Sequence, residues 1–154
     1  MTRQERLRPE FVEFIPDELE EGVIYISIPY TTAAHLCACG CGTEVITPIS
    51  PTDWEVTFDG ENVSLSPSIG NWSFPCQSHY WIKRGRIQWS RTMTPGQIAA
   101  GRAASRRRKE RYAAGLPLDE PAPPAKRNEP RVEEPVREGA LTRLLRRLGF
   151  TNSR

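Results

Sequence analysis

The sequence predicts a mainly β fold: a small antiparallel domain of hairpins, stapled by zinc, followed by a helix, a disordered linker and a short C-terminal amphipathic helix. Three observations favour this fold. Up to residue 92, short segments rich in β-branched and aromatic residues alternate with turn signals. All four cysteines and both histidines lie within residues 35–79. Farther along, six of the 14 prolines fall between positions 117 and 135, which is typical of a linker.

Strands are expected wherever β-forming residues are bounded by turns, over a domain spanning residues 9–92. Segment 23–29 has the strongest strand pattern, because Val, Ile and Tyr dominate it. The other strands are predicted at residues 11–15, 44–48, 54–58, 62–66, 79–82 and 86–89. The last four form two hairpins, around Asp59-Gly60 and Lys83–Gly85. Residues 30–36 lead into the first cysteines, and residues 67–71 form a loop.

A basic helix is predicted next, in a region spanning residues 93–115. Thr94 and Gln97 form a capping box around a proline at the first helical position, and the helix runs over residues 95–114. Its apolar positions are mostly alanine, so it packs shallowly or not at all. A Pro/Glu/Arg-rich linker is predicted at 116–137. Residues 138–150 then form an amphipathic helix with leucines at helical spacing, suited to docking on a protein partner.

Charge is divided unevenly along the 154-residue chain. Residues 1–92 hold 7 Lys/Arg and 12 Asp/Glu, a net charge of −5, whereas residues 93–154 hold 14 and 7, a net charge of +7. The basic helix contains a single aromatic residue, Tyr112, which argues against nucleic acid as a partner. No run approaches the roughly 20 apolar residues of a membrane span. The charged N-terminus lacks a secretion signal, so a cytoplasmic location is expected.

The cysteines and histidines form two tight clusters with metal-ligand character. Zn²⁺ takes four thiolate or imidazole ligands, commonly from two short segments, and a cytosolic location disfavours disulfides. A Cys-x-Cys-x-Cys run rarely places all three sulfurs on one ion. We therefore expect two of Cys37, Cys39 and Cys41 to join Cys76 and His79 on one zinc ion. Cys39 and Cys41 rank first because glycines flank them. A redox thiol cluster and ordinary buried cysteines are the alternatives.

Several polar side chains near the second cluster offer catalytic chemistry. Ser66, Ser68 or Asn71 would supply a nucleophile or an oxyanion donor beside the metal, unless they form an ordinary hydrogen-bonded loop. His79 suits a general base as well as a metal ligand. Glu44 is the nearest carboxylate for a general base. A zinc deaminase is disfavoured, because it needs a His-x-Glu motif that the chain lacks.

Four sequence blocks stand in order along the β domain: Cys37–Gly42, Ser50–Trp54, Ser66–Asn71 and Cys76–Ile82. In these blocks the chain resembles the bacterial domain-of-unknown-function family 6527, over about residues 9–92. Members of that family resemble zinc-binding proteins and are found in bacterial operons with ubiquitin-like proteins and activating- and conjugating-enzyme-like partners.

The resemblance implies a peptidase or deconjugase that acts on a ubiquitin-like tail. The metal-site set that it implies is Cys37, Cys39, Cys41, Cys76 and His79. It also places Ser68 and Ser78 near that set.

Three functions follow from these features. An enzyme would use zinc to polarise a peptide or isopeptide carbonyl or to activate water, with Ser68, His79 and Glu44 as candidate catalytic residues. Its substrate tail would lie along the edge of the second hairpin by strand addition. A binding module would keep the zinc structural, and a nucleic-acid-binding protein would use the basic helix. The predicted function is the first, a zinc-dependent or zinc-stabilised peptidase or deconjugase.

Overall fold

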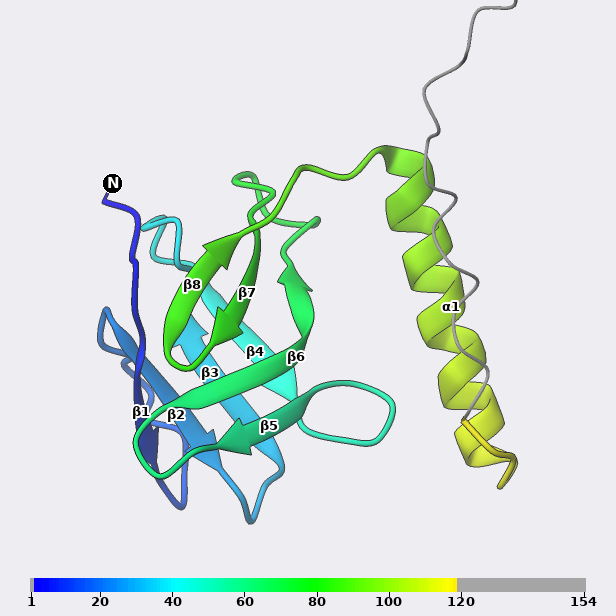
Figure 1. Cartoon of the computed structure of the whole chain (residues 1–154), viewed down its shortest axis with the longest axis horizontal. Coiled ribbons are helices and arrows are strands. Elements are labelled where there is room, and N and C mark those ends of the chain that lie inside the picture. Colours follow the sequence, from blue (N-terminus) through cyan, green and yellow to red (C-terminus); the bar gives the residue numbers. More distant parts are fainter. Residues whose placement is uncertain (1, 119–154) are drawn as a thin grey trace, which may run out of the picture. The chain divides into compact units, whose positions relative to one another are not determined.

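The structure, a computed structural model, describes residues 2–118 and contains two four-stranded sheets and one helix in that range (Figure 1). The first sheet has the order β1-β2-β3-β4. Its strands are β1 (Arg8–Phe11), β2 (Val23–Ser27), β3 (Thr32–Leu36) and β4 (Glu44–Pro48). The second sheet has the order β5-β6-β7-β8. Its strands are β5 (Glu55–Phe58), β6 (Val63–Gly70), β7 (His79–Lys83) and β8 (Arg86–Trp89).

Apolar side chains from both sheets form one core, so the two sheets depend on each other. Ile24 and Ile26 of β2 are fully buried, as are Tyr80 and Ile82 of β7. Burial of side chains of this size stabilises a fold by about 1.5–3 kcal/mol each. Alternation along β7 sends Tyr80 and Ile82 inward, and therefore directs the intervening residues to the outer face of the second sheet. The prediction of a mainly β fold is confirmed.

The first strand differs from its prediction in position and direction. It begins at Arg8 instead of Phe11, because the buried apolar residue of this segment is Leu7, whereas Phe14 is 62% exposed. β1 pairs with β2 in parallel. The domain is thus antiparallel apart from this one pair among the strands that the structure describes.

Two further differences lie next to the predicted site. β3 was not predicted, because Ala33 and Ala34 are weak strand formers, yet both are buried between β2 and β4. β6 continues to Gly70 through the segment predicted as a loop. Its pairing with β7 shifts register between Leu65 and Ile69, where Pro67 lacks a backbone donor. Ser68 therefore lies on a strand.

The N-terminal segment covers the outer edge of the second hairpin. The Leu7 amide donates to the Gly85 carbonyl at 2.7 Å, and the Ile87 amide donates to the Glu5 carbonyl at 2.8 Å. An isolated antiparallel bridge also joins Arg6 to Arg86. At Arg86 and Ile87, the protein's own N-terminal segment already pairs with this edge. The expectation that a substrate adds there as a strand is therefore wrong for these two residues.

The helix follows its prediction closely. α1 (Pro95–Ala113) begins after the Thr94 cap, and the reciprocal contacts of the capping box with Gln97 are both present. None of its residues is buried, as the alanine-rich pattern indicated. No helix within residues 2–118 is long and apolar enough to cross a membrane. Most of the predicted linker at 116–137 and the whole predicted helix at 138–150 lie outside the described residues.

A buried polar pair joins the two sheets across the core. The Nε2 atom of His35 on β3 lies 2.8 Å from the Tyr80 hydroxyl on β7. Complete burial lowers the pKa of His35 to about 4, so the imidazole is neutral at physiological pH. The pair satisfies two polar groups that would otherwise be desolvated without a partner.

Replacing Tyr80 by Phe removes the hydroxyl and leaves the His35 Nε2 atom without its partner in the core. We expect Tyr80→Phe to lower the free energy of unfolding by about 1–3 kcal/mol, because an unpaired buried polar group costs that much. Urea denaturation followed by fluorescence measures the change. The control is Tyr30→Phe, since the Tyr30 side chain is 55% exposed; an equally small change in both variants would contradict the role of the pair.

Candidate functional site

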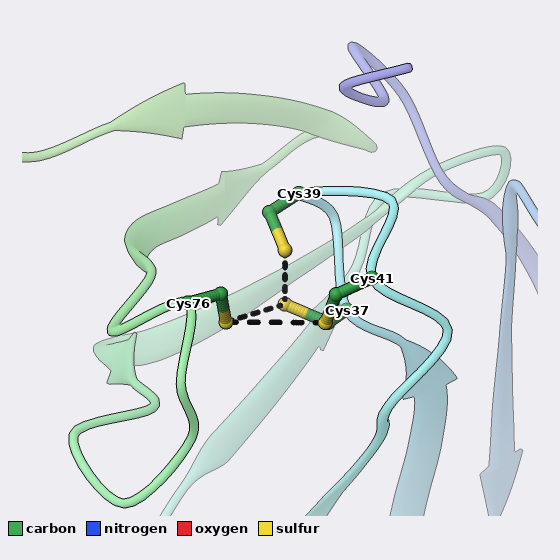
Figure 2. Close-up of side chains that lie close together, drawn as sticks. All are labelled: Cys37, Cys39, Cys41 and Cys76. Carbon is green, nitrogen blue, oxygen red and sulfur yellow. Dashed lines mark hydrogen bonds between the residues drawn. The ribbon is translucent and has the colours of Figure 1, made fainter. Parts of the chain in front are cut away.

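Four cysteine sulfurs meet between the segment after β3 and the loop before β7 (Figure 2). The ligand atoms of Cys37, Cys39, Cys41 and Cys76 all lie within 4.8 Å of one another. The Cys37 sulfur is 3.4 Å from that of Cys39 and 3.9 Å from that of Cys76, and the Cys41–Cys76 distance is also 3.9 Å. Zinc–sulfur bonds of about 2.3 Å in a tetrahedron would place the sulfurs about 3.8 Å apart. The cluster is therefore compatible with a metal ion.

A tight turn brings three sulfurs from one short segment to the cluster. After β3 the Gly40 amide donates to the Cys37 carbonyl at 2.9 Å, and the Cys37 amide donates to the Thr43 carbonyl at 2.8 Å. Gly40 has a φ of +81°, and a Cβ there would lie 2.6 Å from the Thr2 carbonyl oxygen. Only glycine fits this position without strain. The turn explains why the three sulfurs of this segment converge.

The environment of one sulfur favours its thiolate form. Cys41 lies 3.3 Å from the Thr43 hydroxyl, and hydrogen bonds with the side chain and backbone of Thr43 lower the pKa of the Cys41 thiol to about 6. Burial raises the pKa of the neighbouring Cys39 thiol. A thiolate is the form of cysteine that binds a metal, so the Thr43 contacts suit a ligand role for Cys41.

The imidazole of His79 lies apart from the sulfurs, in contrast to the expectation that it would bind the metal with Cys76. His79 begins β7 on the side of the strand opposite to Tyr80, and it is buried as well. Its Nε2 atom lies 3.0 Å from the Ser68 hydroxyl. Its Nδ1 atom lies 2.8 Å from the Arg91 carbonyl. The sulfur cluster contains Cys37 and does not contain His79.

These two contacts fix how His79 is protonated. A backbone carbonyl only accepts, so Nδ1 carries the proton and donates to Arg91. In the neutral imidazole Nε2 is then unprotonated, and it accepts the hydrogen of the Ser68 hydroxyl. The arrangement matches a nucleophile paired with a base whose tautomer is held by a third group. The third group is a main-chain carbonyl here, not a carboxylate.

An indole packs against the imidazole and limits its movement. The ring centroids of Trp72 and His79 are 5.0 Å apart. The Trp72 indole crosses directly over Gly70, and any Cβ at that position would overlap it. Gly70 is also the register partner of His79 in the second sheet. The glycine therefore lets the indole reach the histidine.

Hydrogen bonds connect the sulfur cluster to the start of β7. The Ser78 hydroxyl lies 3.1 Å from the Cys37 sulfur. The Asn71 amide group donates to the Ser78 hydroxyl at 2.9 Å and to the Cys37 sulfur at 3.6 Å. Ser78 immediately precedes His79, and Asn71 immediately follows β6. The network thus clamps both ends of the loop that carries Cys76.

The remaining predicted residues lie away from the Ser68–His79 pair or engage other groups. Glu44 is exposed at the start of β4, where it pairs with Leu36 of β3. Within residues 2–118, no hydrogen bond joins Glu44 to Ser68 or His79. The amide of Asn71 is committed to Ser78 and Cys37. The Arg91 carbonyl and Trp72 carry roles that the sequence did not single out, and no local motif marks a backbone carbonyl as a partner.

The fold and these two sites define a small mainly β protein with a Ser–His pair beside a four-cysteine cluster. A family model described as the bacterial ubiquitination-like system serine protease (BubE) matches residues 11–90. The chain therefore belongs to this family. Neither a curated protein nor a solved structure matches it. The predicted place in a bacterial ubiquitin-like pathway family is confirmed, whereas the label of family 6527 stays a prediction.

A Gly70→Ala substitution tests how the indole holds the histidine. The new methyl group would displace Trp72, so we expect a shift in tryptophan emission and a loss of about 1–3 kcal/mol in the free energy of unfolding. The His79 imidazole resonances should shift with it. Gly101→Ala is the control, since nothing lies within 4 Å of a Cβ there and alanine favours a helix. Unchanged emission and stability in Gly70→Ala would contradict the packing.

Proposed function

We propose that this protein is a serine protease that processes the C-terminal tail of a bacterial ubiquitin-like protein. The observation that carries the proposal is the Ser68–His79 pair, with 3.0 Å between Oγ and Nε2 and with Nδ1 held by the Arg91 carbonyl. Membership of a family described as a serine protease of a ubiquitination-like system supports both the reaction and the pathway. The activating and conjugating enzymes of that pathway are further partners under this proposal.

The geometry supplies the steps of acyl transfer. Nε2 of His79 takes the proton of the Ser68 hydroxyl as Oγ attacks the carbonyl carbon of the tail. The imidazolium then gives that proton to the departing amine, and an acyl group remains on Ser68 until water removes it through the same base. The Arg91 carbonyl accepts from Nδ1 throughout and keeps Nε2 facing the serine. No carboxylate is needed, so Glu44 has no role in this mechanism.

We further propose that the four cysteines hold one zinc ion with a structural role. Four thiolates complete a tetrahedron and leave no open position for water or a substrate carbonyl. When bound, the ion would cross-link the loop after β3 to the loop before β7. This differs from the expectation that zinc itself polarises the scissile carbonyl. The closed sulfur cluster and the separate serine together favour a zinc-stabilised protease.

Removing either member of the pair should abolish cleavage with the fold intact. We expect Ser68→Ala and His79→Gln each to lower the rate by at least about a thousandfold, because the proposed mechanism needs both the nucleophile and its base. Mass spectrometry of a ubiquitin-like protein with an extended C-terminal tail measures cleavage. Ser73→Ala is the control, since Ser73 lies in the exposed part of the adjacent loop and contacts Arg102.

Cleavage that survives in Ser68→Ala would refute the nucleophile. If the intact protein cleaved no tail under any condition, it would act as a non-catalytic binding module of the same pathway. Fluorophosphonate labelling, mapped to a single serine, separates these outcomes. Labelling at Ser68 is expected in the intact protein and in Ser73→Ala, and it should be absent in Ser68→Ala.

The zinc content of the protein should depend on the four cysteines and not on His79. Protein purified without chelators should hold one zinc ion per chain, and Cys76→Ser should lose it because the tetrahedron would lack a ligand. His79→Gln should keep its zinc. Chelation of the intact protein should sharply lower the melting temperature, since binding of a structural zinc contributes on the order of 10 kcal/mol to folding. Elemental analysis that finds full zinc in Cys76→Ser, or none in folded His79→Gln, would contradict the site.

A further inference from the structure

A groove lies on the outer face of the second sheet. Its lining includes Arg6, Ser66, Trp81, Lys83, Arg84 and Arg86. Ser66 and Trp81 each stand two positions from a member of the pair, on β6 and β7. Along the two strands the groove therefore comes within two residues of each member of the pair.

The far end of the groove is strongly cationic. Arg6, Lys83, Arg84 and Arg86 line it and are all exposed, whereas no Asp or Glu lines it. Arg84 is paired with Asp59 at 3.1 Å. Within residues 2–118, Arg6, Lys83 and Arg86 form no ion pair. This cluster stands out because the first 92 residues carry a net charge of −5.

Strand geometry sets the distance between the cationic end and the serine. His79, Trp81 and Lys83 share the outer face of β7, because Tyr80 and Ile82 point into the core. A strand rises about 3.3 Å per residue, so Lys83 lies about 13 Å from His79 along the strand. An extended peptide covers that length in about four residues. Trp81 lies between them, with the Lys83 ammonium 5.2 Å from its ring centroid.

From this arrangement we propose that the groove is a substrate subsite that selects acidic residues about four positions from the scissile bond. The proposal rests on the proposed protease function and adds its sequence preference. The substrate carboxylates pair with Lys83 and Arg86, and the intervening segment packs on Trp81. Nucleic acid is a poorer match, since single strands are commonly held by several stacked aromatic residues and Trp81 is the one aromatic side chain that lines the groove.

Binding is measured first, in the Ser68→Ala variant of the full chain. The probes are fluorescein-labelled twelve-residue Gly/Ser/Thr peptides that carry two adjacent glutamates, or two glutamines in their place. We expect the acidic peptide to bind at least tenfold more tightly. Lys83→Glu/Arg86→Glu should remove that preference, and Arg106→Glu/Arg107→Glu, an equal change of charge on the exposed face of α1, should keep it. Equal binding of the two peptides, or tighter binding of a labelled single-stranded DNA, would overturn the proposal.

Spacing is measured with the intact serine. A fluorophosphonate group is placed at one end of such peptides, and the glutamate pair is set one to six residues from it, in either chain direction. The rate at which Ser68 is labelled should peak near four residues for one direction and fall by at least tenfold in Lys83→Glu/Arg86→Glu. A Ser68 labelling rate that does not depend on the position of the glutamate pair would overturn the subsite but not the proposed serine chemistry. Absence of any Ser68 labelling would instead refute the proposed protease, while the binding experiment still tests the groove.

Discussion

The convergence of four sulfurs from two distant loops is the constraint on which the rest of the site depends. Cys37, Cys39 and Cys41 follow β3 of the first sheet, and Cys76 precedes β7 of the second sheet. The domain is small, and a core of this size stabilises a fold only marginally. Under the proposed zinc site, an ion bound by the four sulfurs would cross-link the sheets at this end and supplement the core. The His35–Tyr80 pair joins β3 to β7 through the interior of the core.

Hydrogen bonds link the sulfur cluster to the segments that carry the catalytic candidates. Cys37 contacts Ser78, and Ser78 precedes the histidine that faces Ser68. The buried Asn71 amide ties this serine to the end of β6. The four cysteines and the Ser–His pair are therefore linked by hydrogen bonds through Ser78 but have no residue in common. A structural ion beside an independent nucleophile, as proposed, would explain how a cysteine-rich domain can belong to a serine protease family.

Much of the fold can be predicted from local sequence patterns, and most of the wrong predictions concern features that depend on contacts between distant residues. β4 and both hairpins follow turn signals and alternation, and the helix follows its capping box. Ala33 and Ala34 form a strand only because β2 and β4 flank them. The Cys-x-x-His spacing of Cys76 and His79 also suits two ligands of one metal ion. In the structure the alternation of β7 separates His79 from the sulfurs, and the turn at Gly40 brings Cys37 into the cluster. No sequence motif marks either of these features.

X-ray absorption at the zinc edge is the decisive measurement for the proposed four-sulfur site, because it counts the ligands and identifies their elements. We expect four sulfur atoms at about 2.3 Å and no imidazole, with a spectrum that is the same in His79→Gln. A nitrogen ligand at about 2.0–2.1 Å that disappears in His79→Gln would rule out the four-sulfur site. That result would make His79 a metal ligand and would leave Ser68 without its proposed base.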